Sequence, residues 1–143
     1  MDGVGSASAI LAVAQVAWNV YKLCRKYYSE VKEARKEIQT LSLEVMLLAD
    51  LLTNVSDLAN DEDSVSFSNI SLLGQQNGPL DQCRELLNTL KTQLDPGEGE
   101  SKMRRYGKRA LKWPFRNKDI ENLLSRIGKH KETLNMALAA DNM

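Results

Sequence analysis

Apolar residues recur at steps of three and four along most of the chain, which is the spacing of one face of an α-helix. The pattern predicts a first helix over residues 6–28, with Ser6 or Ser8 as its N-cap, and a second over residues 29–59. A heptad seam runs along the second helix and consists of Val31, Ala34, Ile38, Leu41, Val45, Leu48, Leu52 and Val55.

The second half of this seam is widened by further apolar residues, which are Leu43, Met46, Leu47 and Leu51. We therefore expect this half of the helix to be packed on two sides. The seam also suits a parallel coiled-coil dimer. The wide apolar face and the other helical segments favour an intramolecular bundle.

The rest of the chain predicts more helices. Residues 60–78 form a loop whose apolar residues lie as a strap over the bundle, and a third helix begins at Pro79, a residue suited to a first helical position, and ends at Asp95-Pro96-Gly97. A short helix over residues 101–113 and a last helix over residues 118–140 follow. Short connections imply antiparallel neighbours, so the predicted fold is all-α, an antiparallel four- to five-helix bundle.

Composition is that of one ordinary globular domain, 1–143, since 43% of the 143 residues are hydrophobic and 27% are charged. Cys24 and Cys83 lie far apart within helical patterns, which favours two buried reduced thiols in a cytosolic protein over a disulfide or zinc site. The net charge of zero conceals an uneven distribution, because residues 101–118 carry eight Lys or Arg and no acid.

Catalytic and metal chemistry have few candidates in the sequence. His130 is the only histidine and stands between two lysines, so a surface or half-buried structural histidine is favoured over a triad member. The sequence has no phosphate-binding glycine loop and no Cys or His cluster with metal-ligand spacing. The adjacent acids of residues 61–63 suit a solvated turn better than a calcium loop. We expect a protein that is not an enzyme, with no catalytic residue, metal or cofactor.

The first helix is apolar almost all round, and such helices are buried either inside a bundle or in lipid. Residues 3–21 are 19 uncharged residues, which make about 28 Å of helix and approach the thickness of a hydrocarbon core. Polar side chains such as Gln15 and Asn19 make this segment a marginal constitutive span. The first Lys comes at position 22, so the basic region of a secretory signal is missing.

The basic segment has three interpretations. It can be a solvated face, or it can be an amphipathic helix that binds an anionic membrane through its cations and aromatic side chains. The candidate headgroup-binding residues are Lys102, Arg104, Arg105, Lys108, Arg109 and Lys112. Nucleic-acid binding is less favoured, because no helix-turn-helix, RNA-binding sheet or zinc finger frames the charges. We therefore expect anionic lipids as partners and no nucleic acid.

Several stretches of the chain resemble a known family. Residues 3–13, residues 28–38 and the Trp-Pro-Phe element at 113–115 resemble the HeLo-like N-terminal domains of fungal NOD-like (STAND) receptors. Residues 130–138 fit the same pattern, so the likeness covers nearly the whole chain. The Trp-Pro-Phe element between two helices is its most specific part.

This resemblance implies a death-inducing bundle, related to the HeLo domain of the HET-S incompatibility protein and similar in design to the bundle of mixed-lineage kinase domain-like protein. It implies a domain that is cytoplasmic at rest, responds to receptor domains further along a longer chain, self-associates, and inserts its first helix into the plasma membrane. The expected insertion residues are Ile10, Leu11, Val13, Ala14, Val16, Ala17, Trp18 and Val20. The alternative is a homotypic or adaptor module that passes a signal without membrane activity.

Overall fold

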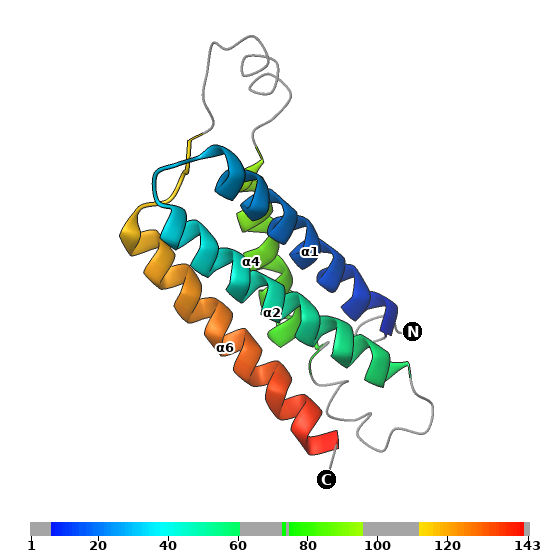
Figure 1. Cartoon of the computed structure of the whole chain (residues 1–143). Helices are drawn as coiled ribbons and strands as arrows, with labels where there is room; N and C mark the ends of the chain where they lie inside the picture. Colours follow the sequence, from blue (N-terminus) through cyan, green and yellow to red (C-terminus); the bar gives the residue numbers. More distant parts are fainter. Residues whose placement is uncertain (1–6, 61–72, 74, 96–111, 142–143) are drawn as a thin grey trace.

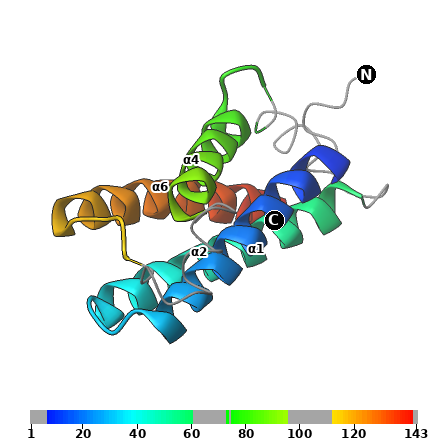
Figure 2. The same ribbon diagram turned by 90° about the horizontal axis from the view of Figure 1, so that it is seen from above.

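The described part of the chain is an all-α bundle, as predicted. A computed structural model describes residues 7–60, 73, 75–95 and 112–141. Within these residues lie four helices and no strand, and the helices are α1 (Ala7–Glu30), α2 (Arg35–Ala59), α4 (Pro79–Leu94) and α6 (Asn117–Asp141). Successive helices run in opposite directions, and α4 crosses the other three obliquely (Figures 1 and 2).

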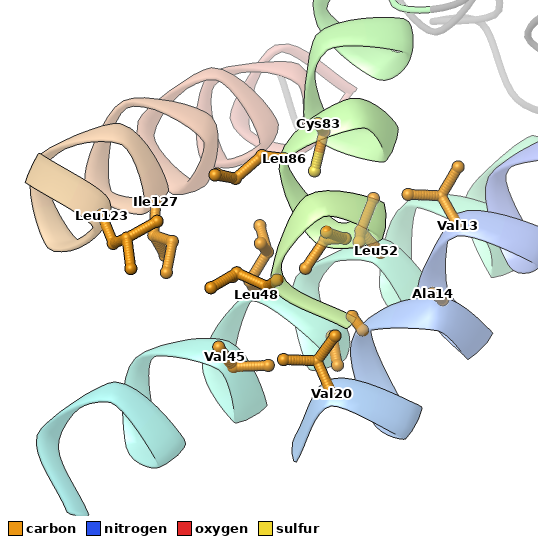
Figure 3. Packing of buried hydrophobic residues seen from close by; sticks show 14 of the residues in the cluster. Val13, Ala14, Val20, Val45, Leu48, Leu52, Cys83, Leu86, Leu123 and Ile127 are labelled. Atoms are coloured by element: carbon orange, nitrogen blue, oxygen red, sulfur yellow. The ribbon is translucent and has the colours of Figure 1, made fainter. Parts of the chain in front are cut away.

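The helices are arranged so that α1 and α6 occupy opposite corners of the bundle. Helix α1 packs on α2 and α4, and α6 packs mainly on α2 and only slightly on α4. The core lies between all four helices, and Figure 3 shows Val13 and Val20 of α1, Leu48 of α2, Leu86 of α4 and Ile127 of α6 converging on it. Helix α2 is therefore packed along two flanks, by α1 on one side and by α6 on the other.

The predicted seam of α2 is confirmed within the helix. Its core residues are all fully buried and are Ile38, Leu41, Val45, Leu48, Leu52 and Val55. The predicted start of this helix was wrong, because α1 continues to Glu30 and α2 begins at Arg35. The chain reverses at residues 31–34, where Ala34 adopts the left-handed conformation with φ of 58°.

Val31 explains why the sequence did not reveal this turn. Its side chain is buried although it lies outside both helices, and its N–H still donates to the Tyr27 carbonyl at 2.8 Å. The apolar spacing of three and four therefore continues from Tyr27 to Ile38 without a break. The turn also contains no Gly or Pro, the residues that usually mark a reversal.

The second half of α2 is packed on two sides, as expected, but two of its leucines are not covered. Leu43 is 49% exposed and Leu47 is 39% exposed, whereas Met46 and Leu51 are half-buried. Helices α1 and α6 cover the two flanks of α2, and no described helix covers its outer face, which carries Leu43 and Leu47. This part of the bundle thus presents apolar side chains to solvent.

The later elements follow the prediction closely where the structure describes them. Helix α4 has Pro79 at its first turn, and α6 begins where the backbone N–H of Arg116 donates to the Asp119 carboxylate at 3.0 Å, a helix-capping contact. Leu73, the one described residue of the strap's apolar set, is buried in the core. Most of the predicted short helix lies outside the described residues, and Lys112 and Trp113 at its end are not helical.

We predict that Leu48→Asp will destabilise the domain severely and that Leu47→Asp will not. The first substitution places an unpaired charge in the core, which costs about 4 kcal/mol or more and is a large share of a stability of about 5–15 kcal/mol. The second places the same charge on the exposed face of the same helix. Thermal unfolding followed by circular dichroism compares the two. Equal melting temperatures would show that the faces of α2 are assigned wrongly.

Candidate functional site

Helix α1 carries all the residues predicted to insert into a membrane, and the bundle buries most of them. The fully or almost fully buried members are Ile10, Val13, Ala14, Ala17 and Val20. Val16 and Trp18 are half-buried against the core, and Leu11 is 42% exposed. Gln15 and Asn19 lie on the exposed side, as expected for the polar positions. The predicted set is therefore the inward face of α1 together with parts of its flanks.

The uncharged part of α1 that is described as helix is shorter than the predicted segment. Residues 3–6 lie outside the described residues, and Ala7–Tyr21 makes about 22 Å of helix, less than a hydrocarbon core of about 30 Å. Spanning therefore requires Lys22 and the basic residues after it to reach the interface with their long side chains, as lysines and arginines do near helix ends.

Two described helices, α1 and α2, are long and apolar enough to cross a membrane by length and composition alone, and a buried core helix passes the same test. The two differ in where their charges lie. Helix α2 has Glu44 and Asp50 near its middle, and Glu44 forms an ion pair with Lys131 of α6. Charges at a helix centre are the costly ones in lipid, so α1 is the better candidate.

Polar contacts with α2 hold the N-terminal half of α1. The Ser56 hydroxyl donates to the Ala7 carbonyl at 2.9 Å, and the Trp18 indole N–H donates to the Thr53 hydroxyl at 3.5 Å. Ser56 is one of two buried polar residues in the described part of the chain. Sequence reasoning missed both contacts, because a serine or threonine inside a helical pattern gives no sign of a partner on another helix.

An aromatic clasp, formed by Tyr27, Trp113 and Phe115, holds the C-terminal end of α1. The Tyr27 and Trp113 rings meet edge to face at 5.4 Å, and Trp113 meets Phe115 in the same way at 5.1 Å. The Tyr27 hydroxyl donates to the Leu94 carbonyl at the end of α4, at 2.9 Å. The clasp thus joins the ends of α1 and α4 to the start of α6, and it explains a structural role for the Trp-Pro-Phe element.

The flank of α1 that faces α4 is less completely covered. A groove of about 360 Å³ runs between the two helices. Its lining residues are Ala9, Ala12, Val13 and Val16 of α1 and Leu80, Asp81 and Arg84 of α4. The small side chains of Ala9 and Ala12 leave space on this flank of α1. Helix α1 thus packs on both α2 and α4, and the groove marks a part where its contact with α4 is incomplete.

The predicted headgroup-binding cluster is mostly outside the described residues. The members that lie outside the described residues are Lys102, Arg104, Arg105, Lys108 and Arg109. Lys112 is described and exposed, immediately before Trp113 of the aromatic clasp. The structure therefore places one member of the cluster near the C-terminal end of α1.

The cysteines and the histidine are placed as predicted. Cys24 and Cys83 are free and buried, and desolvation raises the pKa of each thiol to about 12, so both stay protonated. His130 is half-buried, and burial together with the nearby Arg126 charge lowers its pKa. Within the described residues no group of three or more His, Cys, Asp or Glu is placed to hold a metal ion.

Comparison with known proteins identifies the family. A profile described as pigment biosynthesis cluster protein PigL N-terminal matches residues 1–143, whereas neither a curated protein nor a solved structure matches the chain. The family is a fungal one, and its description names neither a HeLo-like domain nor a receptor. Because the match covers the whole sequence, the chain belongs to the family of fungal PigL N-terminal domains.

Proposed function

We propose that this domain is a HeLo-like, membrane-targeting effector of a fungal NOD-like receptor that induces cell death. It is cytoplasmic at rest, and on activation it self-associates, binds anionic lipids of the plasma membrane and inserts α1. The observation that carries the proposal is α1 itself, which has no charge from Ala7 to Tyr21 and whose apolar inward face is buried in the bundle.

Transfer of α1 from the bundle to lipid exchanges one apolar environment for another. Lipid tails are about as apolar as a leucine side chain, so the buried face of α1 loses little hydrophobic stabilisation on the way. Leu11, which is exposed at rest, gains an apolar environment. The opposing terms are the loss of packing, of the aromatic clasp and of the hydrogen bonds to Thr53 and Ser56.

Release of α1 also uncovers the residues that it had buried, and this supports a role for self-association. Leu41, Leu48 and Leu52 of α2 are fully buried in a core to which α1 contributes. Exposed side chains of this size cost about 1.5–3 kcal/mol each, so a released bundle has to cover them again. A second copy with the same uncovered seam supplies the complementary surface.

An adaptor module is the second candidate, because Leu43 and Leu47 are exposed on α2 in the resting bundle. Adjacent apolar side chains on an outer helix face are suited to a protein contact. In this alternative the domain passes a signal through that contact while α1 stays in place. Loss or retention of membrane activity separates the two functions.

We predict that Gln15→Glu will reduce leakage of anionic liposomes on the order of a hundredfold. Gln15 is exposed, so the folded bundle tolerates the charge, whereas a charge at the helix centre costs about 2.5–3.5 kcal/mol on insertion. The matched control is Gln39→Glu, the same change on an exposed position of α2. Wild-type leakage and cell killing by a folded Gln15→Glu protein would favour the adaptor function.

We predict that replacing Arg104, Arg105, Lys108 and Arg109 by Glu will abolish sedimentation with anionic liposomes. Each cation near the surface contributes about 1 kcal/mol of attraction, and reversal turns attraction into repulsion. The control reverses four other cations, at the exposed positions Lys32, Arg35, Lys36 and Lys91. Helical circular dichroism should be preserved in both proteins. If the two variants bind liposomes equally well, the segment is a solvated face.

We predict that Tyr27→Phe will lower stability and raise basal leakage. Loss of the hydroxyl leaves the Leu94 carbonyl without this donor, at a cost of about 1–3 kcal/mol, and loosens the end of α1 in the resting state. Tyr28→Phe is the control, since the neighbouring Tyr28 ring lies against Arg25 and Arg35 through its face and keeps those contacts. A less stable Tyr27→Phe protein with unchanged leakage would show that this end does not limit release.

A further inference from the structure

A second groove lies between α4 and α6, the neighbouring helices that pack least extensively on each other. Its volume is about 280 Å³. Its lining residues are Pro79, Gln82 and Glu85 of α4 and Arg126, Lys129, His130 and Thr133 of α6. It contains none of the residues assigned to insertion or to the basic segment, so the function proposed for α1 leaves it unexplained.

The α6 wall of this groove is basic. Lys129 and His130 follow Arg126 by three and four residues, so both lie next to it on the helix surface. Glu85 lies on the α4 wall, yet in the described part of the chain neither Arg126 nor Lys129 reaches it within ion-pair distance. Two permanent cations therefore face an open groove without a paired carboxylate.

The neutral polar side chains of the groove already have partners. The Thr133 hydroxyl donates to the Lys129 carbonyl, and the Gln82 amide donates to the Asn77 carbonyl, each at 3.0 Å. The donors left to face a ligand are therefore charged or chargeable, and they suit an anion. A guanidinium adds a planar fork that matches the oxygens of a phosphate.

His130 stands at the floor of the groove, where it also lines a narrow apolar pocket with Cys83 and Leu52. The groups that face it are the cations of its own helix, Glu85 and the protonated thiol of Cys83 from α4, and apolar Leu52 from α2. Burial and Arg126 lower its pKa, so at neutral pH it is mainly uncharged. A bound anion would offset both effects and favour the protonated imidazole, which adds a third cation.

We propose that the groove between α4 and α6 binds a phosphate monoester, held by Arg126 and Lys129 and by the protonated imidazole of His130. The volume accommodates a phosphate with a small polar group such as glycerol. The ligand is either a soluble phosphate ester or the headgroup of a lipid with a terminal phosphate. The site goes beyond the proposed function, because a soluble ester occupies it without any membrane.

To test this, the full chain is titrated with glycerol 3-phosphate. Binding is measured by calorimetry and by the chemical shifts of α6 amides. Wild type should bind saturably, and Arg126→Gln with Lys129→Gln should weaken binding at least about tenfold, since a single charged hydrogen bond is worth about 1.5–3 kcal/mol. The control double variant Lys32→Gln with Lys36→Gln removes the same charge from exposed positions outside the groove and should bind like wild type.

Glu85→Gln gives a change of opposite sign, because it removes the one carboxylate of the groove while the cations stay. Its affinity should exceed that of wild type severalfold. A general dependence on net charge would move the control as much as the groove variants and would overturn the proposal. Equal binding by wild type and the Arg126 and Lys129 double variant would also overturn it.

A second arm identifies the source of the phosphate. Phosphatidylcholine vesicles with and without phosphatidic acid are compared in sedimentation, with the same variants. Saturable binding of the soluble ester alone assigns a soluble ligand, and variant-sensitive binding of phosphatidic acid vesicles alone assigns a lipid headgroup. No saturable, variant-sensitive binding in either arm rejects the site. This test does not measure leakage. Its result is therefore independent of whether Gln15→Glu shows that α1 inserts into a membrane.

The role of His130 is read from pH. Relative to His130→Gln, the affinity of wild type for glycerol 3-phosphate should rise as pH falls from 7.5 to 6, because ligand binding and imidazole protonation favour each other. His130→Gln keeps a hydrogen-bond donor without the titration, so its affinity should follow the protonation of the ligand alone. Wild type and His130→Gln are titrated with the same ligand, so the protonation of the ligand itself affects both equally and cancels in the comparison. Identical pH profiles would remove His130 from the site and leave the two permanent cations.

Discussion

The packing of α1 against the seam of α2 is the interaction on which the rest of the structure depends. Helix α1 is apolar on more than one face, so it needs cover from two neighbours, and α2 and α4 supply it. Helix α2 can serve α1 on one flank only because α6 covers the other. The small residues Ala14, Ala17 and Ala49 at the core let these helices approach closely.

The helical spacing of apolar residues predicted most of the fold, and each wrong prediction has a local cause. Ile38 to Val55 could be assigned to the core because their spacing matches a buried stripe. Val31 misled for the same reason, since a side chain can be buried from a turn as well as from a helix. Burial of Leu43 and Leu47 was predicted wrongly, because a hydrophobic residue can be buried only where a neighbouring helix covers it. The sequence pattern of one helix does not show where its neighbours lie.

The features of the candidate sites that depend on one helix could be predicted from the sequence, and those that depend on contacts between distant segments could not. The outward position of Gln15 and the inward positions of Ile10 and Val13 follow from one helix alone, so sequence sufficed. The contact of Tyr27 with Leu94 joins residues far apart in the chain and has no local signature. The groove is harder still, because His130 appears in the sequence between Lys129 and Lys131, whereas in space one lysine faces the groove and the other pairs with Glu44.

The two proposed sites are linked through the stability of the resting bundle. The groove lies between α4 and α6, the neighbouring helices with the least contact, and α4 is also one of the two helices that α1 would leave in the proposed insertion. A ligand that binds the groove only in the resting arrangement stabilises that arrangement and opposes release of α1. A ligand with higher affinity for the released arrangement acts in the opposite direction, by the same amount of free energy that separates its two affinities. The sign of the coupling therefore depends on whether release of α1 brings Arg126 and Lys129 closer to α4 or separates them.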